Sequence, residues 1–524
     1  MDVSPTEVLL SLLLFVVAWV LFVPRLQSWY SRRSRFNSLM AKIPGRKSIP
    51  IIGDCYELVS NPQNKFLEII AGLVKEKGAL FRIWIGPFMG SVHISSWKYA
   101  EEIFNSNVHI EKSSTYDFLH KWLGTGLLTS TGAKWHSRRK LLTPAFHRAI
   151  LDGFQEVFVD KSDTLLKILE AKSNQSEAFD IAPYIWQCSL DIICETSMGT
   201  KMSIQENVSK EDEAYLKSIS FVAETTLYRF LRPWLHPNFI FNLTSKGRAH
   251  NNSVKLMHAY SNKVIQSRKK EYLQKLGMKS NGNSEENEDL GIKKKRQAFI
   301  DILIEAAFAE GHEKKPILSD EDIREEVDTF MFEGHDTTAS AISWTIYLLG
   351  LHPETQEEVA AELTEIFGDE KIKSTQKLSE LRLLDRCVRE ALRLYPSVPM
   401  IARKIREEVK LGEYTVPAEA ELVIHMFYMH RDKEIFPEPD KFNPDNFLPE
   451  ACEKRPPYAF VPFSAGSRNC IGQKFAMQEA KTVVASIVQK YKIESIQSPQ
   501  ELILLPELIL RSENGIKVRL RPRK

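Results

Sequence analysis

The chain has 524 residues, of which 43% are hydrophobic and 26% are charged, and its formal net charge is +2. This composition is ordinary for a globular protein with a large core, and the near-neutral balance excludes nucleic acid as a partner bound by overall charge. The cysteines are scattered without a C-x-x-C pair, which argues against a disulfide framework or a zinc ribbon and favours reduced thiols: Cys55, Cys188, Cys194, Cys387, Cys452 and Cys470.

The first predicted element is a membrane anchor. Val8–Val23 is an unbroken apolar run apart from Ser11. Its 16 residues would span ~24 Å as a helix, slightly less than the ~27 Å core of an endoplasmic-reticulum bilayer. Basic residues follow the run instead of preceding it, which disfavours a cleaved signal peptide and directs the rest of the chain to the cytosol. We therefore expect residues 1–25 to be a single-pass anchor in the endoplasmic reticulum membrane.

A basic, proline-containing segment follows the anchor. Prolines such as Pro44 do not continue a helix, so residues 26–47 are expected to form a stiff hinge. Residues 48–524 contain no internal repeat and are expected to form one domain. Helical periodicity occurs at 253–275, 298–309, 321–350, 354–367, 380–395 and 472–491. Strand-like pieces are short and lie at 81–85, 409–411, 502–511 and 516–520. The expected fold class is mainly α with minor β.

The stretch 228–241 crowds aromatic residues around two prolines. It fits a buried connection between helices or a second contact with the membrane, and the sequence leaves both interpretations open.

The predicted helix 321–350 contains helix-weakening residues at its centre. Gly334 costs about 1 kcal/mol in a helix interior, and the hydroxyls of Thr337 and Thr338 can bond back to carbonyl groups. A local kink and a groove are expected there. Asp336 beside Thr337 is an acid–hydroxyl pair, which suits a proton relay.

Two features further along the chain concern an ion pair and a thiol. Glu390 and Arg393 lie three residues apart on one predicted helix face, a spacing that is common in solvated ion pairs. A turn-forming loop then presents Cys470 immediately before a helix. The helix dipole and free amide groups favour a thiolate at that position, and a thiolate is a good axial ligand for haem iron.

The loop of Cys470 carries a recognisable motif. Phe463–Gly472 reads FSAGSRNCIG, which fits FxxGxRxCxG at every fixed position and resembles the haem-binding loop of the cytochromes P-450. Glu390 and Arg393 then resemble the pair that braces this loop in the family. The resemblance covers the chain from about residue 40. It implies the cytochrome P-450 fold, a single haem-binding monooxygenase domain behind an N-terminal transmembrane helix, with haem b on Cys470.

The resemblance implies further contacts with the cofactor: Trp135 and Arg139 as the family's WxxxR, Arg403, Arg468 and Phe463. Arginines suit the haem propionates because they form bidentate, charge-assisted pairs with carboxylates. One position departs from the family. The usual PxRF segment reads PDNF here, with the uncharged amide of Asn446 in place of an arginine.

The helix 321–350 carries the implied oxygen chemistry. The family assigns proton delivery to Thr337 and Asp336. Glu333 stands where most members have alanine, and the surrounding run resembles family four, the fatty-acid ω-hydroxylase branch. In that branch this glutamate can form an ester with a haem methyl group, and a carboxylate buried near haem would otherwise need a partner. The implied reaction is ω-hydroxylation of a medium- or long-chain fatty acid.

Electrons are expected from a partner protein. The Gly124–Gly126 segment lacks the full dinucleotide fingerprint and its βαβ context. The resemblance therefore implies an NADPH-dependent flavoprotein reductase, with cytochrome b5 as a further donor. Basic residues expected near the thiolate side could dock an acidic reductase: Arg138, Lys140, Arg468 and Lys474.

Two alternatives remain at this point. A peroxide-rearranging enzyme would need neither O2 nor a reductase, and the intact Asp336–Thr337 pair disfavours it. The other alternative is a non-catalytic haem- or lipid-binding membrane protein. Apolar Val398, Met400 and Ile401 predict a hydrophobic cavity without naming its ligand.

Overall fold

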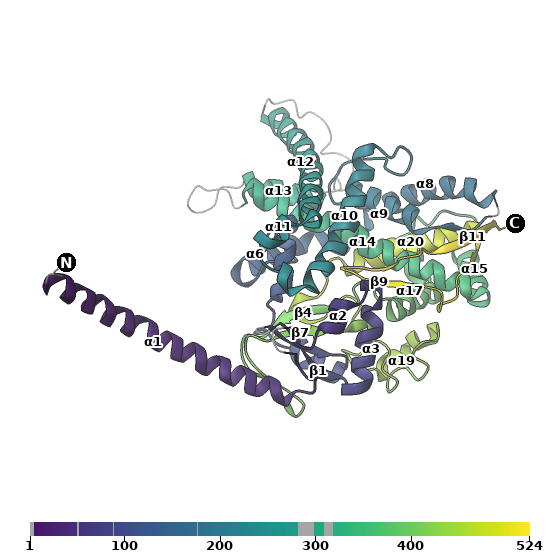
Figure 1. The fold of residues 1–524 in the computed structure, drawn as a ribbon. Helices are drawn as coiled ribbons and strands as arrows, with labels where there is room; N and C mark the ends of the chain where they lie inside the picture. Colours follow the sequence, from purple (N-terminus) through teal and green to yellow (C-terminus); the bar gives the residue numbers. More distant parts are fainter. Residues whose placement is uncertain are drawn as a thin grey trace.

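The computed structural model of the chain describes residues 5–49, 52–86, 89–175, 177–280, 298–308 and 318–523. Helices make up most of the domain, and a small mixed sheet lies at one side, next to α2 and α3 (Figure 1). The predicted class, mainly α with minor β, is confirmed.

The helices have the following bounds: α1 (Pro5–Lys42), α2 (Tyr56–Ser60), η1 (Gln63–Lys65), α3 (Phe66–Lys77), α4 (Trp97–Phe104), η2 (Ser114–Leu119), α5 (His120–Leu123), α6 (Gly132–Leu142), η3 (Thr143–Phe146), α7 (Arg148–Asp152), α8 (Gln155–Ser173), α9 (Ala182–Thr196), α10 (Lys210–Phe230), η4 (Pro233–Leu235), α11 (Asn238–Leu243), α12 (Ser245–Ser280), α13 (Phe299–Phe308), α14 (Asp320–Leu351), α15 (Pro353–Phe367), α16 (Thr375–Glu380), α17 (Arg382–Leu394), α18 (Met426–Met429), η5 (Pro444–Phe447), α19 (Pro449–Lys454), η6 (Gly466–Arg468) and α20 (Gln473–Lys490).

The strands are β1 (Leu80–Ile85), β2 (Met89–Ile94), β3 (Phe179–Asp180), β4 (Ile401–Lys404), β5 (Val409–Leu411), β6 (Tyr414–Val416), β7 (Glu421–Ile424), β8 (Tyr491–Ser495), β9 (Leu504–Pro506), β10 (Leu510–Ser512) and β11 (Lys517–Pro522). The largest sheet has the order β1-β2-β7-β4. Only its β2–β7 pair is parallel, with Ser91 opposite Glu421.

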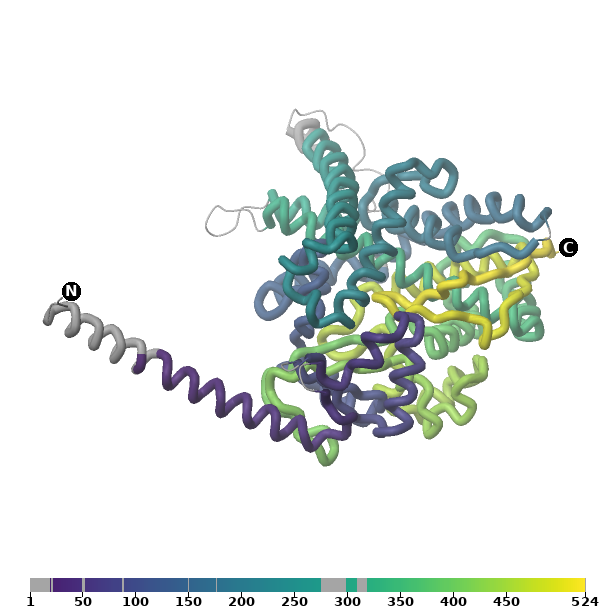
Figure 2. Tube along the Cα trace, viewed as in Figure 1, coloured from purple at the N-terminus to yellow at the C-terminus, as the bar shows by residue number. Residues whose placement is uncertain are grey.

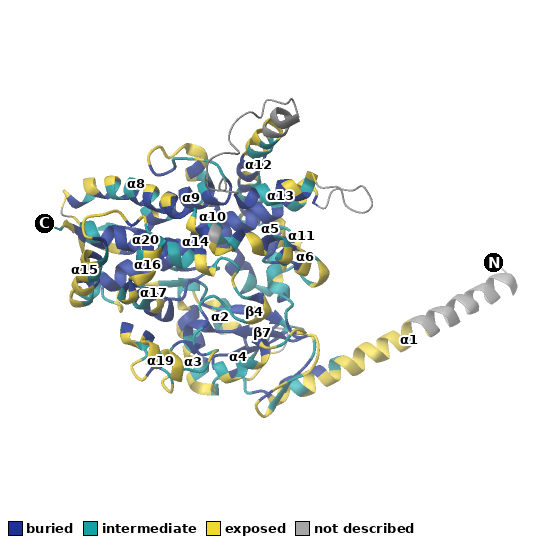
Figure 3. Cartoon of the chain, turned by 180° about the vertical axis from the view of Figure 1, so that it is seen from behind, coloured by how far each residue is buried: buried dark blue, intermediate teal, exposed yellow. Residues whose placement is uncertain are grey.

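The helix α14 forms the centre of the helical part. It packs against α9, α12, α17 and α20, and most of its side chains are buried. Its start is set by a capping box in which Ser319 and Asp322 satisfy each other's backbone N–H groups. A second, smaller core lies between the sheet and the end of α1. The buried regions in Figure 3 follow these two packing centres.

The helical periodicity of the sequence predicted the positions of six helices correctly. Five of the six ranges agree with α13, α14, α15, α17 and α20, and 253–275 falls within the longer α12. Of the two predicted C-terminal strands, 516–520 agrees with β11, whereas the prediction of one strand over 502–511 was wrong. The range 502–511 is two strands, β9 and β10, that pair with each other across a turn, while β11 pairs with β3 and β8. Local periodicity does not show that turn, because β9 and β10 have only three residues each.

The N-terminal helix differs from the expected anchor and hinge. α1 continues through Pro24 to Lys42 and projects from the domain (Figure 2). A proline removes one backbone hydrogen bond of a helix and need not end it. The helix ends where Phe36 and Met40 pack into the smaller core, so the expected hinge 26–47 is helical up to Lys42. Among the described residues, no helix is both long and apolar enough to cross a bilayer.

The stretch 228–241 is partly buried and partly exposed, which agrees with a connection between helices and leaves the membrane contact a prediction. Leu235 and Phe241 are buried, as a connection between helices requires. Trp234 and Phe239 are 54% and 69% exposed, and Leu243 just beyond them is 75% exposed. The segment thus presents an apolar face to its surroundings.

Candidate functional site

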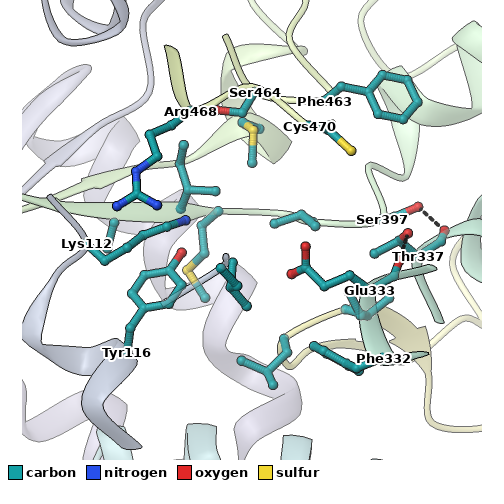
Figure 4. Close-up of a pocket in the computed structure, with 18 of the residues that line it drawn as sticks. Lys112, Tyr116, Phe332, Glu333, Thr337, Ser397, Phe463, Ser464, Arg468 and Cys470 are labelled. Carbon is teal, nitrogen blue, oxygen red and sulfur yellow. Dashed lines mark hydrogen bonds between the residues drawn. The ribbon is translucent and has the colours of Figure 1, made fainter. Parts of the chain in front are cut away.

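A largely apolar cavity lies between α14 and the loop before α20 (Figure 4). The sheet supplies another part of its wall, and further parts come from α6, α9, α10, α17 and the turn between β9 and β10. Val398, Met400 and Ile401 line it as predicted. Such a cavity suits an apolar ligand with a few oriented polar groups.

The loop of Cys470 is shaped by close backbone contacts. Gly466 has a φ of +67°, and a Cβ atom there would lie 2.0 Å from the carbonyl oxygen of Phe104, so only glycine fits. The backbone N–H of Cys470 donates to the carbonyl of Phe463 at 2.8 Å. Gly472 is the residue before α20, which places the thiol beside the amino end of a long helix.

Cys470 points its thiol into the cavity and lines it (Figure 4). The cavity makes the side chain accessible, although protein surrounds it, and burial raises the pKa of the thiol to about 11. The negative charge of Glu333 raises this pKa further, whereas the N–H of Gly472 and the charge of Arg139 lower it. The other five cysteines do not line this cavity. Cys470 is therefore the cysteine placed to bind a cofactor.

Three cations gather beside the cavity: Lys112 and Arg468 line it, and Arg403 lies next to them. Arg403 and Arg468 are 3% and 9% exposed, and Lys112 stands over the ring of Tyr116 at 4.5 Å. Burial lowers the pKa of each, that of Arg468 to about 9. Among the described residues, none of the three is ion-paired to a carboxylate, and the guanidinium of Arg468 donates to the carbonyls of Ile110, Leu127 and Ser130. Buried cations without counter-ions fit the two propionates of haem.

Trp135 and Arg139 lie on α6 and line the cavity. The guanidinium of Arg468 stacks over the ring of Trp135 at 4.3 Å. Arg139 donates to the backbone and side-chain oxygens of Asn469, both at 2.8 Å. The arginine therefore braces the cysteine loop. Phe463 lies next to Cys470 at the start of that loop (Figure 4).

The Glu390–Arg393 pair is buried, not solvated. Both side chains are fully buried and form two hydrogen bonds of 2.7 and 2.8 Å. Arg393 also donates to three backbone carbonyls in the segment that leads to the cysteine loop. Asn446 donates its amide to Glu390 at 3.0 Å. Asn446 thus supplies a neutral hydrogen-bond donor to the Glu390–Arg393 pair at the position where an arginine is usual.

On α14, the hydroxyls of Thr337 and Thr338 donate to the carbonyls four residues earlier, at 2.7 and 3.0 Å. The helix is continuous here, so the expected kink does not interrupt it. A Cβ atom on Gly334 would lie 2.4 Å from Ile193 of α9, so this glycine permits close helix packing. Thr337 and Glu333 both line the cavity.

The Glu333 carboxylate points into the cavity from the side opposite Lys112 (Figure 4). Burial raises its pKa, and the positive charge of Lys112 opposes the shift. Among the described residues it has no ion pair. Its position fits either an ester or a charge interaction with a cofactor between the two residues.

Asp336 takes a different partner from the one expected. Its carboxylate is fully buried, and one guanidinium nitrogen of Arg511 on β10 donates to both of its oxygens, at 2.6 and 2.7 Å. Arg511 also donates to Ser220 of α10 and stacks over Trp186. Asp336 does not line the cavity, although its neighbour Thr337 does. The structure therefore separates the acid from the hydroxyl by their orientation on the helix.

The predicted basic docking patch is only partly exposed. Arg138 is buried and pairs with Asp322 of α14 at 2.5 Å, and Arg468 belongs to the buried cation cluster. The prediction that these two arginines are exposed was wrong. The ion pair with α14 holds Arg138 in the interior, and Arg468 lies against the cavity. Lys140 and Lys474 are exposed.

Three residues of the site escaped the sequence analysis. Lys112 completes the cation cluster, Arg511 holds Asp336, and Glu507 lines the cavity in the turn between β9 and β10. None lies in a recognisable motif. Only the tertiary fold brings them to the cavity.

The Gly124–Gly126 segment has a structural role. The N–H of Thr125 donates to the carboxylate of Glu325 on α14 at 2.9 Å, and a Cβ atom on Gly124 would lie 2.3 Å from that carboxylate. The glycines allow this close approach.

Comparison with known proteins gives a consistent result. A model of the family Cytochrome P450 matches residues 43–520. Cytochrome P450 4c3 of Drosophila melanogaster is 45% identical, with 99% of this chain and 95% of the relative aligned. Cytochrome P450 4V2 of Homo sapiens is 42% identical over 91% of this chain and 89% of the relative. Cytochrome P450 4c21 of Blattella germanica is 39% identical over 92% and 93%.

Proposed function

This chain belongs to the cytochrome P450 family of haem-thiolate monooxygenases, and we propose that it hydroxylates the terminal carbon of medium- or long-chain fatty acids. Its cofactor is haem b and its relatives are members of family four. One observation carries the proposal: the thiol of Cys470 opens into an apolar cavity opposite Glu333 and Thr337.

Different residues around the cavity would hold different parts of the haem. Cys470 would bind the iron as a thiolate, because metal coordination deprotonates a thiol. Arg403, Arg468 and Lys112 would neutralise the propionates. When bound, the haem supplies oxygen activation and the attack on the C–H bond. Arg139 keeps the cysteine loop in place through its two hydrogen bonds to Asn469.

Proton delivery is assigned to Thr337 and Asp336. The hydroxyl of Thr337 is at the cavity wall and donates to the carbonyl of Glu333 at 2.7 Å. Rotation about its Cα–Cβ bond would turn the proton into the cavity. Asp336 would take up a proton from solvent and return it to that hydroxyl, and the contact with Arg511 orients its carboxylate.

Attack at the end of an alkyl chain requires control of position. A terminal methyl has a stronger C–H bond than the neighbouring methylene, so geometry must outweigh intrinsic reactivity, and positioning can contribute several kcal/mol. An ester between Glu333 and a haem methyl would fix the macrocycle against α14. It would also narrow the space next to Thr337, so that only a slim chain end fits.

The electron donor and the membrane are the proposed partners. Lys140 on α6 and Lys474 on α20 are exposed and could attract an acidic NADPH-dependent flavoprotein reductase, with cytochrome b5 as a further donor. Residues 1–25 would anchor the chain in the endoplasmic reticulum membrane with the domain in the cytosol. Trp234, Phe239 and Leu243 would add an apolar contact with the same surface.

Product analysis with a panel of fatty acids of different length tests the proposal. We expect ω-hydroxylated products from the full-length protein with reductase and NADPH, and haem that partly resists acid extraction after turnover. In Glu333→Ala the haem should extract freely, and the product should shift toward ω-1. The ester and its steric role would be contradicted if the haem of the unaltered enzyme were extracted completely and the ratio of ω to ω-1 product were the same in Glu333→Ala.

The same assay separates the alternatives. A haem- or lipid-binding protein without activity would form no hydroxylated product. A peroxide-rearranging enzyme would act on a lipid hydroperoxide without NADPH. The exposure of Thr337 to the cavity favours the monooxygenase.

A further inference from the structure

Glu507 is a carboxyl group of the cavity that the proposed mechanism does not use. It lies in the turn between β9 and β10, followed by Leu508 and Ile509, which also line the cavity. Among the described residues it has neither a hydrogen bond nor an ion pair. The residue is half-buried, and a carboxyl group that has lost part of its water shell is costly unless a ligand supplies a partner.

The other charged residues of the cavity lining have partners or face the haem side: Lys112, Arg139, Glu333, Glu421 and Arg468. Glu421 accepts hydrogen bonds from the N–H and the hydroxyl of Ser114 through one carboxylate oxygen, while its other oxygen is buried without a partner. The remaining four form the cation cluster, brace the cysteine loop, or lie opposite it. Within the part of the chain that the structure describes, Glu333 and Glu507 are the acids of the lining with neither carboxylate oxygen hydrogen-bonded, and Glu333 is already assigned to the haem, which leaves Glu507 for the substrate.

The charged residues around Glu507 are paired with one another, so they leave its own negative charge without a counter-ion. Arg511 of β10 is committed to Asp336 of α14, and Lys246 of α12 pairs with Glu224 of α10 at 2.7 Å. On η1 and α3, Lys65 and Glu68 pair with each other. Burial raises the pKa of Glu507 to about 7; the charges of Glu224 and Asp336 raise it too, against Arg511 and Lys246. The two nearby cations are therefore already neutralised by other acids.

We propose that Glu507 is a specificity-determining residue that binds the polar end of the lipid substrate by accepting a hydrogen bond from it. A fatty alcohol supplies such a donor at any pH. A fatty carboxylate supplies none, so it binds only when one proton is shared between its carboxyl group and that of Glu507. The inference rests on the proposed function, because it assumes an alkyl chain whose far end reaches the haem.

Spectral titration of the full-length holoenzyme in detergent tests this inference. The haem absorption shift is measured with decanoate and with decan-1-ol at pH 6 and pH 8. The protonated fraction of a carboxyl group with a pKa of about 7 falls about tenfold over this interval. We expect the Kd for decanoate to rise about tenfold or more, and the Kd for decan-1-ol to change less than about twofold.

Two variants show whether Glu507 causes the pH dependence of the decanoate Kd. Glu507→Gln keeps the shape, removes the titration and supplies an amide that donates to a fatty carboxylate at either pH, so the decanoate Kd should change less than about twofold between pH 6 and pH 8. Glu513→Gln changes an exposed acid near the same hairpin and should keep the full pH dependence. The inference would be overturned if the decanoate Kd of Glu507→Gln kept the full pH dependence. It would also be overturned if the Kd for decan-1-ol rose as much as the Kd for decanoate in the unaltered protein. If neither lipid shifts the haem spectrum and neither lipid is hydroxylated, the proposed function is contradicted as well.

Discussion

Asp336 and Thr337 are adjacent in the sequence but face different surroundings. Consecutive helical residues point about 100° apart, so one side chain faces the cavity and the other faces Arg511. The residue types predicted the relay, but Arg511 lies 175 positions further along the chain and no local pattern connects it with Asp336. For the same reason the sequence predicted Cys470, Arg403 and Glu333 as site residues but not Lys112 or Glu507.

Thr337→Ala tests the relay at the level of a single hydroxyl. Proton transfer by a positioned group typically contributes about 10²–10⁴-fold, so we expect the yield of product per NADPH consumed to fall about tenfold or more, with peroxide released instead. Ser343→Ala is the matched control, because Ser343 is a buried, back-bonded hydroxyl on the same helix outside the cavity. Unchanged coupling in Thr337→Ala would show that another group carries the protons.

At the scale of elements, the long helices were predictable because each buries one face of a 3.6-residue period. The strands β2, β4 and β7 were not, because β7 meets both β2 and β4 only in the tertiary fold. The β2–β7 pairing joins Ser91 to Glu421, far apart in the chain. The end of α1 was missed because its buried face depends on the sheet.

The contact between α17 and η5 shows how one substitution is accommodated. Asn446 replaces the family's arginine, yet its amide still donates to Glu390. Arg455 packs against Phe436, Phe447 and Phe460 and donates to the backbone carbonyl of Asn446, which holds the segment in place.

Asn446→Ala should therefore destabilise the holoenzyme. A hydrogen bond to a charged group contributes about 1.5–3 kcal/mol, and its loss leaves Glu390 with one donor fewer. Asp445→Ala serves as the control, because Asp445 forms an exposed ion pair with Arg386 that is worth about 0–1 kcal/mol. The measurement is denaturant unfolding followed by haem release. Equal stability of the two variants would contradict a role for Asn446 in the network.

At the scale of the whole molecule, α1 and the apolar face of η4 and α11 are the candidate membrane contacts. Deletion of residues 1–25 should release much of the protein from membranes while haem binding stays intact. The remaining attachment should be lost when Trp234→Ser and Phe239→Ser are added to the deletion, because both side chains are exposed. Flotation with vesicles measures both steps. Full membrane binding by the triple variant would contradict these contacts.

The central claim is that the Cys470 thiolate holds the haem, and the carbon monoxide spectrum of the reduced protein tests it most directly. The unaltered protein should show the long-wavelength band that is typical of a thiolate-ligated haem. Cys470→Ala should lose this band, whereas Cys452→Ala, which removes the exposed surface cysteine, should keep it. Persistence of the band in Cys470→Ala would contradict the assignment of the ligand and, with it, the site described around the cavity.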